Sequence, residues 1–191
     1  MSAASSLTRH VHYALGRARE VNDHSACYGR TVNVLAERFP ALTQIPRIAL
    51  TSLPTPVAKL SRVSERVEGS VWIKRDDLTA PEYGGNKVRK LEYVLAKARD
   101  RGADTIVTTG SVGSHHVFAS ALFGRSNGFE THAVVTPQKR TRHAEDQLRA
   151  DLYVGARLYP ATSYAAVAKE MAELVVKLKL WGHRPFVVPK V

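Results

Sequence analysis

The sequence of 191 residues contains a single cysteine, Cys27, so an intramolecular disulfide and a cysteine-based metal cluster are both excluded. It has no apolar run of the roughly 18 to 20 residues that a membrane-spanning helix needs. No secretory signal pattern is found near its start. We therefore expect a cytoplasmic protein without a membrane partner. Neither a Gly-x-Gly-x-x-Gly fingerprint nor a Walker lysine motif is present, which argues against the common nucleotide-binding sites.

Acidic residues are few relative to basic ones. The 28 Lys and Arg residues stand against 17 Asp and Glu, which gives a formal net charge of +11. Such a charge would suit a polyanionic partner. The basic residues are scattered, however, with denser spots at 86–101 and 138–143, and neither spot is interleaved with the aromatic residues of single-strand binders. A solvated basic face is the better interpretation, and we expect no nucleic-acid partner.

Helical and strand patterns alternate along the second half of the chain. The spacing predicts helices at 86–102, 114–127, 143–154 and 163–182, and strands at 104–110, 131–137, 156–161 and 184–189. Apolar strands separated by single helices indicate right-handed crossovers and a parallel sheet covered on both faces. We therefore predict an α/β fold. We interpret residues 70–78 as a further buried strand that runs into an acidic turn.

The stretch "KRDDLTAPEYGGNKVRKLE" places Lys87 in the first turn of a predicted helix, directly after Gly84, Gly85 and Asn86. The free N–H groups and the dipole at a helix start favour acidic side chains rather than basic ones. The position of this lysine therefore needs an explanation of its own. The combination of an acidic turn, two glycines and a lysine is also much more specific than any of its parts.

A second candidate stretch, "TTGSVGSHHVFAS", leads from a strand into a helix through Gly110, Ser111, Gly113 and Ser114. Small residues let the backbone approach a ligand closely, and a helix start offers N–H groups to an anion such as a carboxylate or a phosphate. Ser114 is placed to act as a hydroxyl donor or a nucleophile, and a simple N-cap is an equally good interpretation. A hydrolase nucleophile elbow would need a second glycine after the serine, which is missing.

His115 and His116 are adjacent at the start of this predicted helix. Neighbouring residues on a helix point about 100° apart. The two rings therefore do not chelate one ion as an i, i+4 pair does, and we expect no metal site.

Together these stretches closely resemble pyridoxal-phosphate enzymes of the tryptophan synthase β-like fold (fold type II), in the branch of 1-aminocyclopropane-1-carboxylate deaminase and D-cysteine desulfhydrase. The resemblance covers about residues 38–189. It includes, in the order of the family, "RFPALTQIPRIALTSLPTPVAKL", "GSVGSHHVFASALFGRSNGF" and "RPFVVP". It implies a pyridoxal 5'-phosphate-dependent deaminase or desulfhydrase, of the lyase or hydrolase class, that acts on a small amino acid and forms a homodimer.

The resemblance also implies roles for the residues around the lysine. Lys87 matches the catalytic lysine that is bonded covalently to the cofactor aldehyde, and Asn86 lies beside the cofactor. Lys90 matches a further lysine of the family. Arg89 and Glu92 would support the helix.

For the second stretch, the resemblance implies that Ser114 is a catalytic residue that lies near the substrate carboxylate. Ser111, Gly113 and His116 would complete the substrate-binding loop. His115 stands where the family has an asparagine that bonds the ring hydroxyl of the cofactor. An imidazole can donate a similar hydrogen bond, although it is bulkier and titrates near neutral pH.

The resemblance divides the chain into an N-terminal extension (1–37), a leading segment with the cofactor-lysine region of the large domain (38–90), a small α/β domain (91–180) and a return strand (181–191). The family fold continues beyond such a strand with a glycine-rich phosphate loop, so we expect its C-terminal part to be missing here. The alternative is a truncated, catalytically inactive relative that acts as a binding or vestigial domain.

Overall fold

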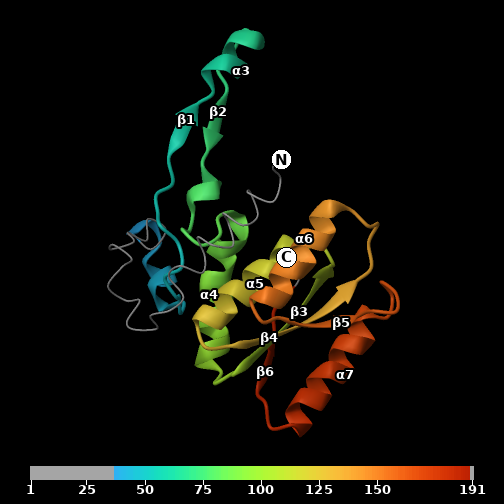
Figure 1. Cartoon of the computed structure of the whole chain (residues 1–191). Helices are drawn as coiled ribbons and strands as arrows, with labels where there is room; N and C mark the ends of the chain where they lie inside the picture. Colours follow the sequence, from blue (N-terminus) through green and yellow to red (C-terminus); the bar gives the residue numbers. More distant parts are fainter. Residues whose placement is uncertain (1–36, 190–191) are drawn as a thin grey trace.

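The computed structural model describes residues 37–189, so the predicted N-terminal extension up to residue 36 and Cys27 lie outside the described residues. An α/β body carries one long projecting arm (Figure 1). Its elements are η1 (Pro40–Gln44), β1 (Val57–Lys59), α3 (Ser61–Arg66), β2 (Trp72–Lys74), η2 (Asp76–Leu78), α4 (Asn86–Asp100), β3 (Thr105–Ser111), α5 (His115–Ser126), β4 (Glu130–Thr136), α6 (Arg142–Tyr153), β5 (Arg157–Pro160), α7 (Val167–Leu180) and β6 (Pro185–Val187).

The body is built on a four-stranded sheet with the strand order β5-β4-β3-β6, and all its pairings are parallel. The predicted α/β fold with a parallel sheet is confirmed. The chain first moves outward from β3 through α5, β4 and α6 to β5, and α7 then returns it to the other side of β3. The strand order therefore reverses at β3. In open parallel sheets, ligands bind outside the carboxyl ends of the strands at such a reversal.

Helices cover both faces of this sheet, as predicted. In Figure 1, α4, α5 and α6 lie on one face and α7 lies on the other. Successive side chains of a strand point to opposite faces, and β3 shows this directly. Ile106 packs in the cluster that contains Leu95 of α4, whereas Val107 packs with Leu174 and Leu178 of α7.

Helix α4 follows its predicted pattern closely. Leu95 and Ala98 are buried on its inner face. Gly102, at φ +67°, ends the helix, and the Ala103 N–H donates to the Ala98 carbonyl at 3.0 Å. This is the wrapped C-terminus that a glycine in the left-handed region permits.

Helix α7 begins at Val167, four residues later than predicted. The Ser163 hydroxyl oxygen accepts a hydrogen bond from the Ala166 N–H at 3.2 Å. Glu170 accepts bonds from the N–H and the hydroxyl of Thr162 at 3.1 and 2.7 Å. These local side-chain bonds hold residues 163–166 in a turn that precedes the helix.

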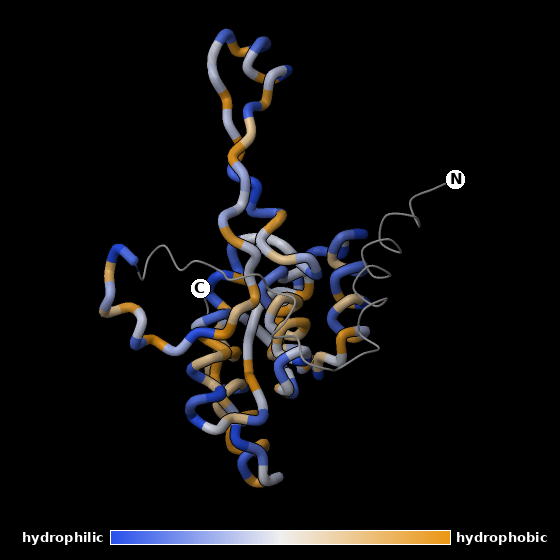
Figure 2. The backbone as a smooth tube through the Cα atoms, turned by 90° about the vertical axis from the view of Figure 1, so that its left-hand side faces the viewer, coloured by the Kyte–Doolittle hydropathy of each residue, from blue (hydrophilic) through white to orange (hydrophobic). Residues whose placement is uncertain are grey.

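The arm consists of β1 and β2, which pair in antiparallel fashion, with α3 between them at the tip. Figure 2, turned by 90°, shows the same projection, with hydrophobic positions along the arm as well as in the body. The predicted burial of the 70–78 strand is wrong, because all three residues of β2 are exposed and Trp72 is 59% exposed. Within residues 37–189, β1 is the only strand that pairs with β2.

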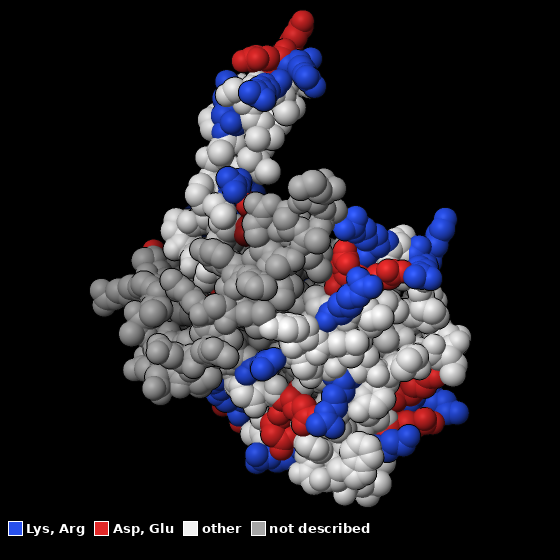
Figure 3. Space-filling view, viewed as in Figure 1, with Lys and Arg blue, Asp and Glu red and all other residues white. Residues whose placement is uncertain are grey.

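None of the helices in the described part of the chain is long and apolar enough to cross a membrane. Figure 3 shows Lys and Arg interspersed with Asp and Glu over the visible face, and both signs occur at the tip of the arm. This mixed surface agrees with a solvated, partly basic face.

The leading segment is held to α4 by the buried side chain of Glu92. Its Oε1 atom accepts hydrogen bonds from the Leu50 N–H (3.0 Å), the Thr51 N–H (2.9 Å) and the Thr51 hydroxyl (2.6 Å). Arg47 donates to both carboxylate oxygens at 2.8 and 2.9 Å. A buried carboxylate is costly unless it is paired and hydrogen-bonded. These contacts therefore fix the path of residues 47–51 against the helix that begins beside Lys87.

Replacing Glu92→Gln tests this anchor. The amide would place N–H groups against existing donors and leave the Arg47 charge unpaired, so the free energy of unfolding should fall by about 3 kcal/mol or more. Urea unfolding measures the change. Glu173→Gln on exposed α7, where the Lys169 pair is 3.9 Å apart, is the matched control and should cost less than about 0.5 kcal/mol. An equally small effect at Glu92 would contradict its role as the anchor.

Candidate active site

Two glycines form the tight turn that precedes α4. A Cβ atom at position 84 would lie 1.9 Å from the Asp77 carbonyl oxygen, so only glycine fits this close approach. Gly85 has φ +111°, a conformation that favours glycine. Its N–H contacts the Asp76 carbonyl at 2.6 Å and the Thr79 hydroxyl oxygen at 2.8 Å. Both glycines therefore allow the start of α4 to pack closely against the acidic turn η2.

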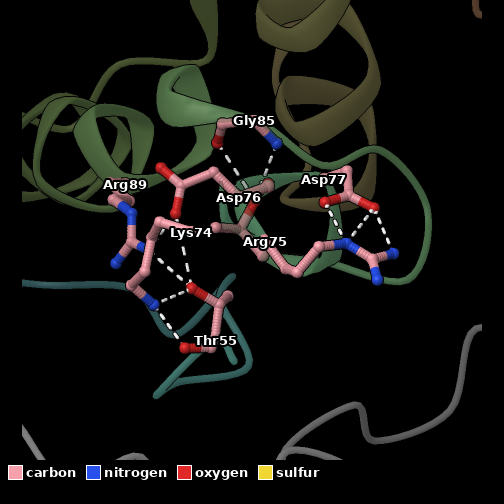
Figure 4. A network of polar contacts seen from close by, with 8 residues as sticks. Thr55, Lys74, Arg75, Asp76, Asp77, Gly85 and Arg89 are labelled. Carbon is pink, nitrogen blue, oxygen red and sulfur yellow. Dashed lines mark hydrogen bonds and ion pairs between the residues drawn. The ribbon is translucent and has the colours of Figure 1, made fainter. Parts of the chain in front are cut away.

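A polar network joins the acidic turn, the base of the arm and α4 (Figure 4). Arg89 of α4 pairs with Asp76 at 2.8 Å, and this hydrogen bond lowers the pKa of the Asp76 carboxyl. Lys74 donates to the carbonyl and hydroxyl oxygens of Thr55. Arg89 thus ties the first turn of α4 to η2, in keeping with the supporting role that the resemblance implies.

Lys87 lies half-buried in the first turn of α4. Within residues 37–189 its amine takes part in no hydrogen bond or ion pair. Burial first, and then the charges of Lys87 and Lys90, lower the pKa of the half-buried His116 on α5. The Nε2 atom of His116 lies 3.2 Å from the Thr108 hydroxyl of β3. The structure therefore brings Lys87 and His116 to the same region between α4 and α5.

The serine loop, residues 111–114, lies at the carboxyl end of β3, where the strand order reverses. Ser114 forms the N-cap of α5, because its hydroxyl oxygen accepts a bond from the Val117 N–H at 3.5 Å. A Cβ atom at Gly110 would lie 2.5 Å from that hydroxyl. The Gly113 N–H donates to the side-chain oxygen of Gln138 at 3.1 Å. The N-cap interpretation of Ser114 is confirmed, and glycine at 110 is what makes room for it.

His115 has different neighbours from His116, as their positions on a helix predict. Its Nδ1 atom is hydrogen-bonded to the hydroxyl of Tyr83, and its ring centroid lies 5.2 Å from that of His143 on α6. Burial and the neighbouring His143 lower the pKa of His115. The Tyr83 ring packs edge-on against Phe118 at 4.8 Å. His115, although exposed, is thus held by the chain segment that carries the lysine.

Three of the predicted site residues, Ser111, Gly113 and Ser114, lie on this one loop at the carboxyl end of β3. Asn86 opens α4 with an exposed side chain. The roles of all the site residues remain predictions.

Sequence reasoning missed several residues of this region. Gln138 follows β4, whose carboxyl end lies beside that of β3, so the edge rule for parallel sheets could have indicated it. Tyr83 belongs to the lysine stretch, although no local pattern links it to a histidine 32 residues away.

Asp151 is a buried carboxyl on α6 that no sequence pattern indicated. Neither of its oxygens has a hydrogen-bond partner among the described residues. Burial raises the pKa of Asp151 to about 7, and the nearby Gln147 amide offsets this only in part. Burial and then the charge of Asp151 raise the pKa of Tyr83 to about 12. The Tyr83 phenol therefore stays protonated at neutral pH.

A groove of about 1130 Å³ lies elsewhere, between α4, α7 and β6. Its walls include Tyr93, Val175 and Phe186, and neither Lys87 nor Ser114 lines it. This groove is therefore not the place where the candidate chemical groups meet.

Residues 48–190 match the profile of the pyridoxal-phosphate dependent enzymes. A D-cysteine desulfhydrase of Yersinia pestis is 37% identical over 153 residues, which cover 78% of this chain and 46% of the relative. A Pyrococcus horikoshii protein, whose name proposes 1-aminocyclopropane-1-carboxylate deaminase activity, is 34% identical over 151 residues, 79% of this chain and 46% of the relative. The chain thus spans about half the length of the curated relatives it matches.

Solved structures also match this chain over most of its length. The crystal structure of an ACC deaminase homologue matches with a TM-score of 0.70 and 35% identity, over 79% of this chain and 46% of that one. An O-ureido-L-serine synthase matches with a TM-score of 0.50 and 21% identity, over 75% of this chain and 42% of that one. The second likeness shows the fold alone.

The buried Asp151 generates a prediction about stability and pH. A carboxyl whose pKa is higher in the folded state binds its proton more tightly there, so stability falls as the pH rises from about 4 towards 7. Asp151→Asn should therefore raise the free energy of unfolding at pH 8 by about 1–3 kcal/mol. The gain should disappear near pH 4. Urea unfolding at both pH values measures it.

The control is Asp100→Asn at the exposed end of α4, which should change the free energy of unfolding by less than about 0.5 kcal/mol. A loss of stability in Asp151→Asn at pH 8 would show that the ionised carboxylate has a partner that stabilises the fold.

Proposed function

The chain belongs to the pyridoxal-phosphate dependent enzyme family, and from that premise we propose that it functions as a deaminase or desulfhydrase that acts on a small amino acid. Its predicted tryptophan synthase β-like fold is confirmed by the likeness to the ACC deaminase homologue. The observation that carries the proposal is the amine of the half-buried Lys87. It lies at the start of α4, near enough to His116 of α5 to lower the pKa of that histidine, and it has no hydrogen-bond or ion-pair partner within residues 37–189.

The residues present fit the aldehyde end of pyridoxal 5'-phosphate. A lysine amine is the group that bonds such an aldehyde, and Lys87 is not engaged elsewhere in the described chain. A Cβ atom placed on Gly85 would meet nothing within 4 Å, so the turn before the lysine is open on that side. The helix starts of α4 and α5 also supply N–H groups that favour an anion.

In the proposed site, Lys87 would hold the cofactor and would move a proton at the α-carbon of the substrate or at the neighbouring carbon. The bound cofactor supplies an electron sink for the negative charge that develops on the substrate carbon. Asn86 would lie beside the cofactor. His115 would donate a hydrogen bond to the cofactor ring oxygen in place of the family asparagine.

The serine loop holds the substrate carboxylate in this proposal. Ser114 lies at the start of α5, where the hydroxyl and the helix N-terminus both favour an anion. Ser111 and Gly113 shape the loop around the carboxylate. His116, whose pKa is lowered, stays neutral beside the lysines and contributes a hydrogen bond without adding charge.

The proposed substrates are of the 1-aminocyclopropane-1-carboxylate or D-cysteine type, after the names of the relatives. We further propose a cytoplasmic homodimer. The alternative function, a catalytically inactive binding or vestigial domain, differs from the first in whether Lys87 reacts with the cofactor.

The proposal predicts a covalent adduct at one lysine. Purified protein mixed with pyridoxal 5'-phosphate should develop the absorbance band of lysine-bound cofactor, and borohydride should trap the adduct on the peptide that contains Lys87. Lys87→Ala should abolish both signals, because it removes the reacting amine. Spectroscopy and peptide mass analysis measure them.

Lys97→Ala is the matched control, since Lys97 is exposed on the same helix. It should leave the band and the trapped peptide unchanged. Equal labelling of Lys87 and Lys97, or a band that persists in Lys87→Ala, would favour the inactive alternative.

A further inference from the structure

A tyrosine on the lysine segment and a histidine beside the candidate serine are joined by a hydrogen bond. The Tyr83 hydroxyl contacts the Nδ1 atom of His115, and the two rings are nearly stacked, with centroids 6.1 Å apart and planes at 27°. Tyr83 lies four residues before Lys87, and His115 directly follows Ser114. The bond therefore links the two stretches that carry the proposed chemistry.

The direction of this hydrogen bond decides which nitrogen of His115 carries the proton. A neutral imidazole has one N–H donor and one acceptor nitrogen, and the partner of one nitrogen sets the state of the other. A phenol hydroxyl is a good donor but a weak acceptor, whereas an unprotonated imidazole nitrogen is a good acceptor. Tyr83 stays protonated because its pKa is raised to about 12, and the lowered pKa of His115 favours its neutral ring.

We infer that Tyr83 is a positioning residue whose hydroxyl donates a hydrogen bond to Nδ1 of His115 and so fixes the tautomer with the proton on Nε2. His115 then presents an N–H donor, rather than a lone pair, at the start of α5. The inference rests on the proposed function only for the acceptor of that N–H, which is the cofactor ring oxygen. The tautomer itself does not depend on it.

The packing around Tyr83 supports a fixed geometry. Its ring is held edge-on by Phe118 at 4.8 Å with planes at 72°. The ring of His143 lies 5.2 Å from the ring of His115 and is tilted by 42°. The imidazole therefore has two neighbouring rings, and Tyr83 provides its hydrogen bond.

A second tyrosine–histidine pair in the same chain provides an internal comparison. The Tyr159 hydroxyl lies 2.9 Å from Nδ1 of the buried His132, and Nε2 of that ring lies 3.2 Å from the Glu130 carboxylate. A carboxylate accepts but does not donate, so Nε2 of His132 must carry a proton. In its neutral form this ring therefore accepts the tyrosine hydroxyl at Nδ1, the arrangement that we infer for His115.

Nitrogen-15 NMR of the labelled protein at neutral pH tests the tautomer directly. The long-range spectrum of the imidazole rings should show His115 with a protonated Nε2 and an acceptor Nδ1. In Tyr83→Phe this signature should be replaced by an averaged mixture of tautomers. Tyr159→Phe, the matched control, should leave His115 unchanged, and His132 should keep its proton on Nε2 because Glu130 still accepts it.

The inference is overturned if His115 carries its proton on Nδ1 in the wild type, or if Tyr83→Phe leaves the His115 pattern unchanged. Neither result would bear on whether Lys87 binds the cofactor.

Cofactor affinity tests where the Nε2–H points. Tyr83→Phe should weaken pyridoxal 5'-phosphate binding, titrated by absorbance, by roughly 3- to 10-fold, the range for a neutral hydrogen bond. His115→Asn restores a fixed amide donor, so adding Tyr83→Phe to it should cause no further weakening. Equal weakening by Tyr83→Phe in both backgrounds would show that Tyr83 acts on the cofactor without His115. Absence of any wild-type adduct would refute the proposed function and leave the NMR result standing.

Discussion

The position of the candidate site depends on one buried carboxylate. Glu92 lies five residues after Lys87 on α4 and binds Arg47, Leu50 and Thr51 of the leading segment. Each unsatisfied group in such a cluster would be costly, so losing any one of these contacts would destabilise the cluster. Rotating α4 or sliding it along its axis would break several of them at once. The Glu92 carboxylate thus sets the position of Lys87, which lies more than one helical turn away and whose amine has no partner in the part of the chain that the structure describes.

The two ends of the parallel sheet use their polar groups differently. At the amino ends, His132 is bonded through both ring nitrogens, and Asp104 accepts bonds from the Arg184 N–H and from the Thr105 hydroxyl. At the carboxyl ends, the Gly113 N–H has only an exposed side-chain partner, and Lys87 has none among the described residues. The Lys87 amine is thus available to a ligand near the carboxyl end of β3, where ligands bind in open parallel sheets.

Local patterns predicted most of the body of this fold. The apolar stripe of α4, its end at Gly102 and the parallel strands follow from the spacing of residues that are close together in the sequence. The packing of the folded chain agrees with these local patterns. The burial of 70–78 could not be predicted in the same way, because an apolar pattern does not tell whether another surface covers it. The late start of α7 depended on side-chain bonds around Ser163 that compete with the helix.

The candidate site was predictable only where it was locally unusual. Lys87 breaks the charge preference of a helix start, and Ser114 follows a run of small residues, so both could be singled out. Which of two adjacent histidines faces the lysine depends on the rotation of α5 against α4, which sequence does not encode locally. Gly84 shows the limit most clearly, since no local pattern indicates that a Cβ atom at this position would meet the Asp77 carbonyl oxygen. Of the two glycines, Gly85 alone leaves an open side towards which a flat cofactor could lie.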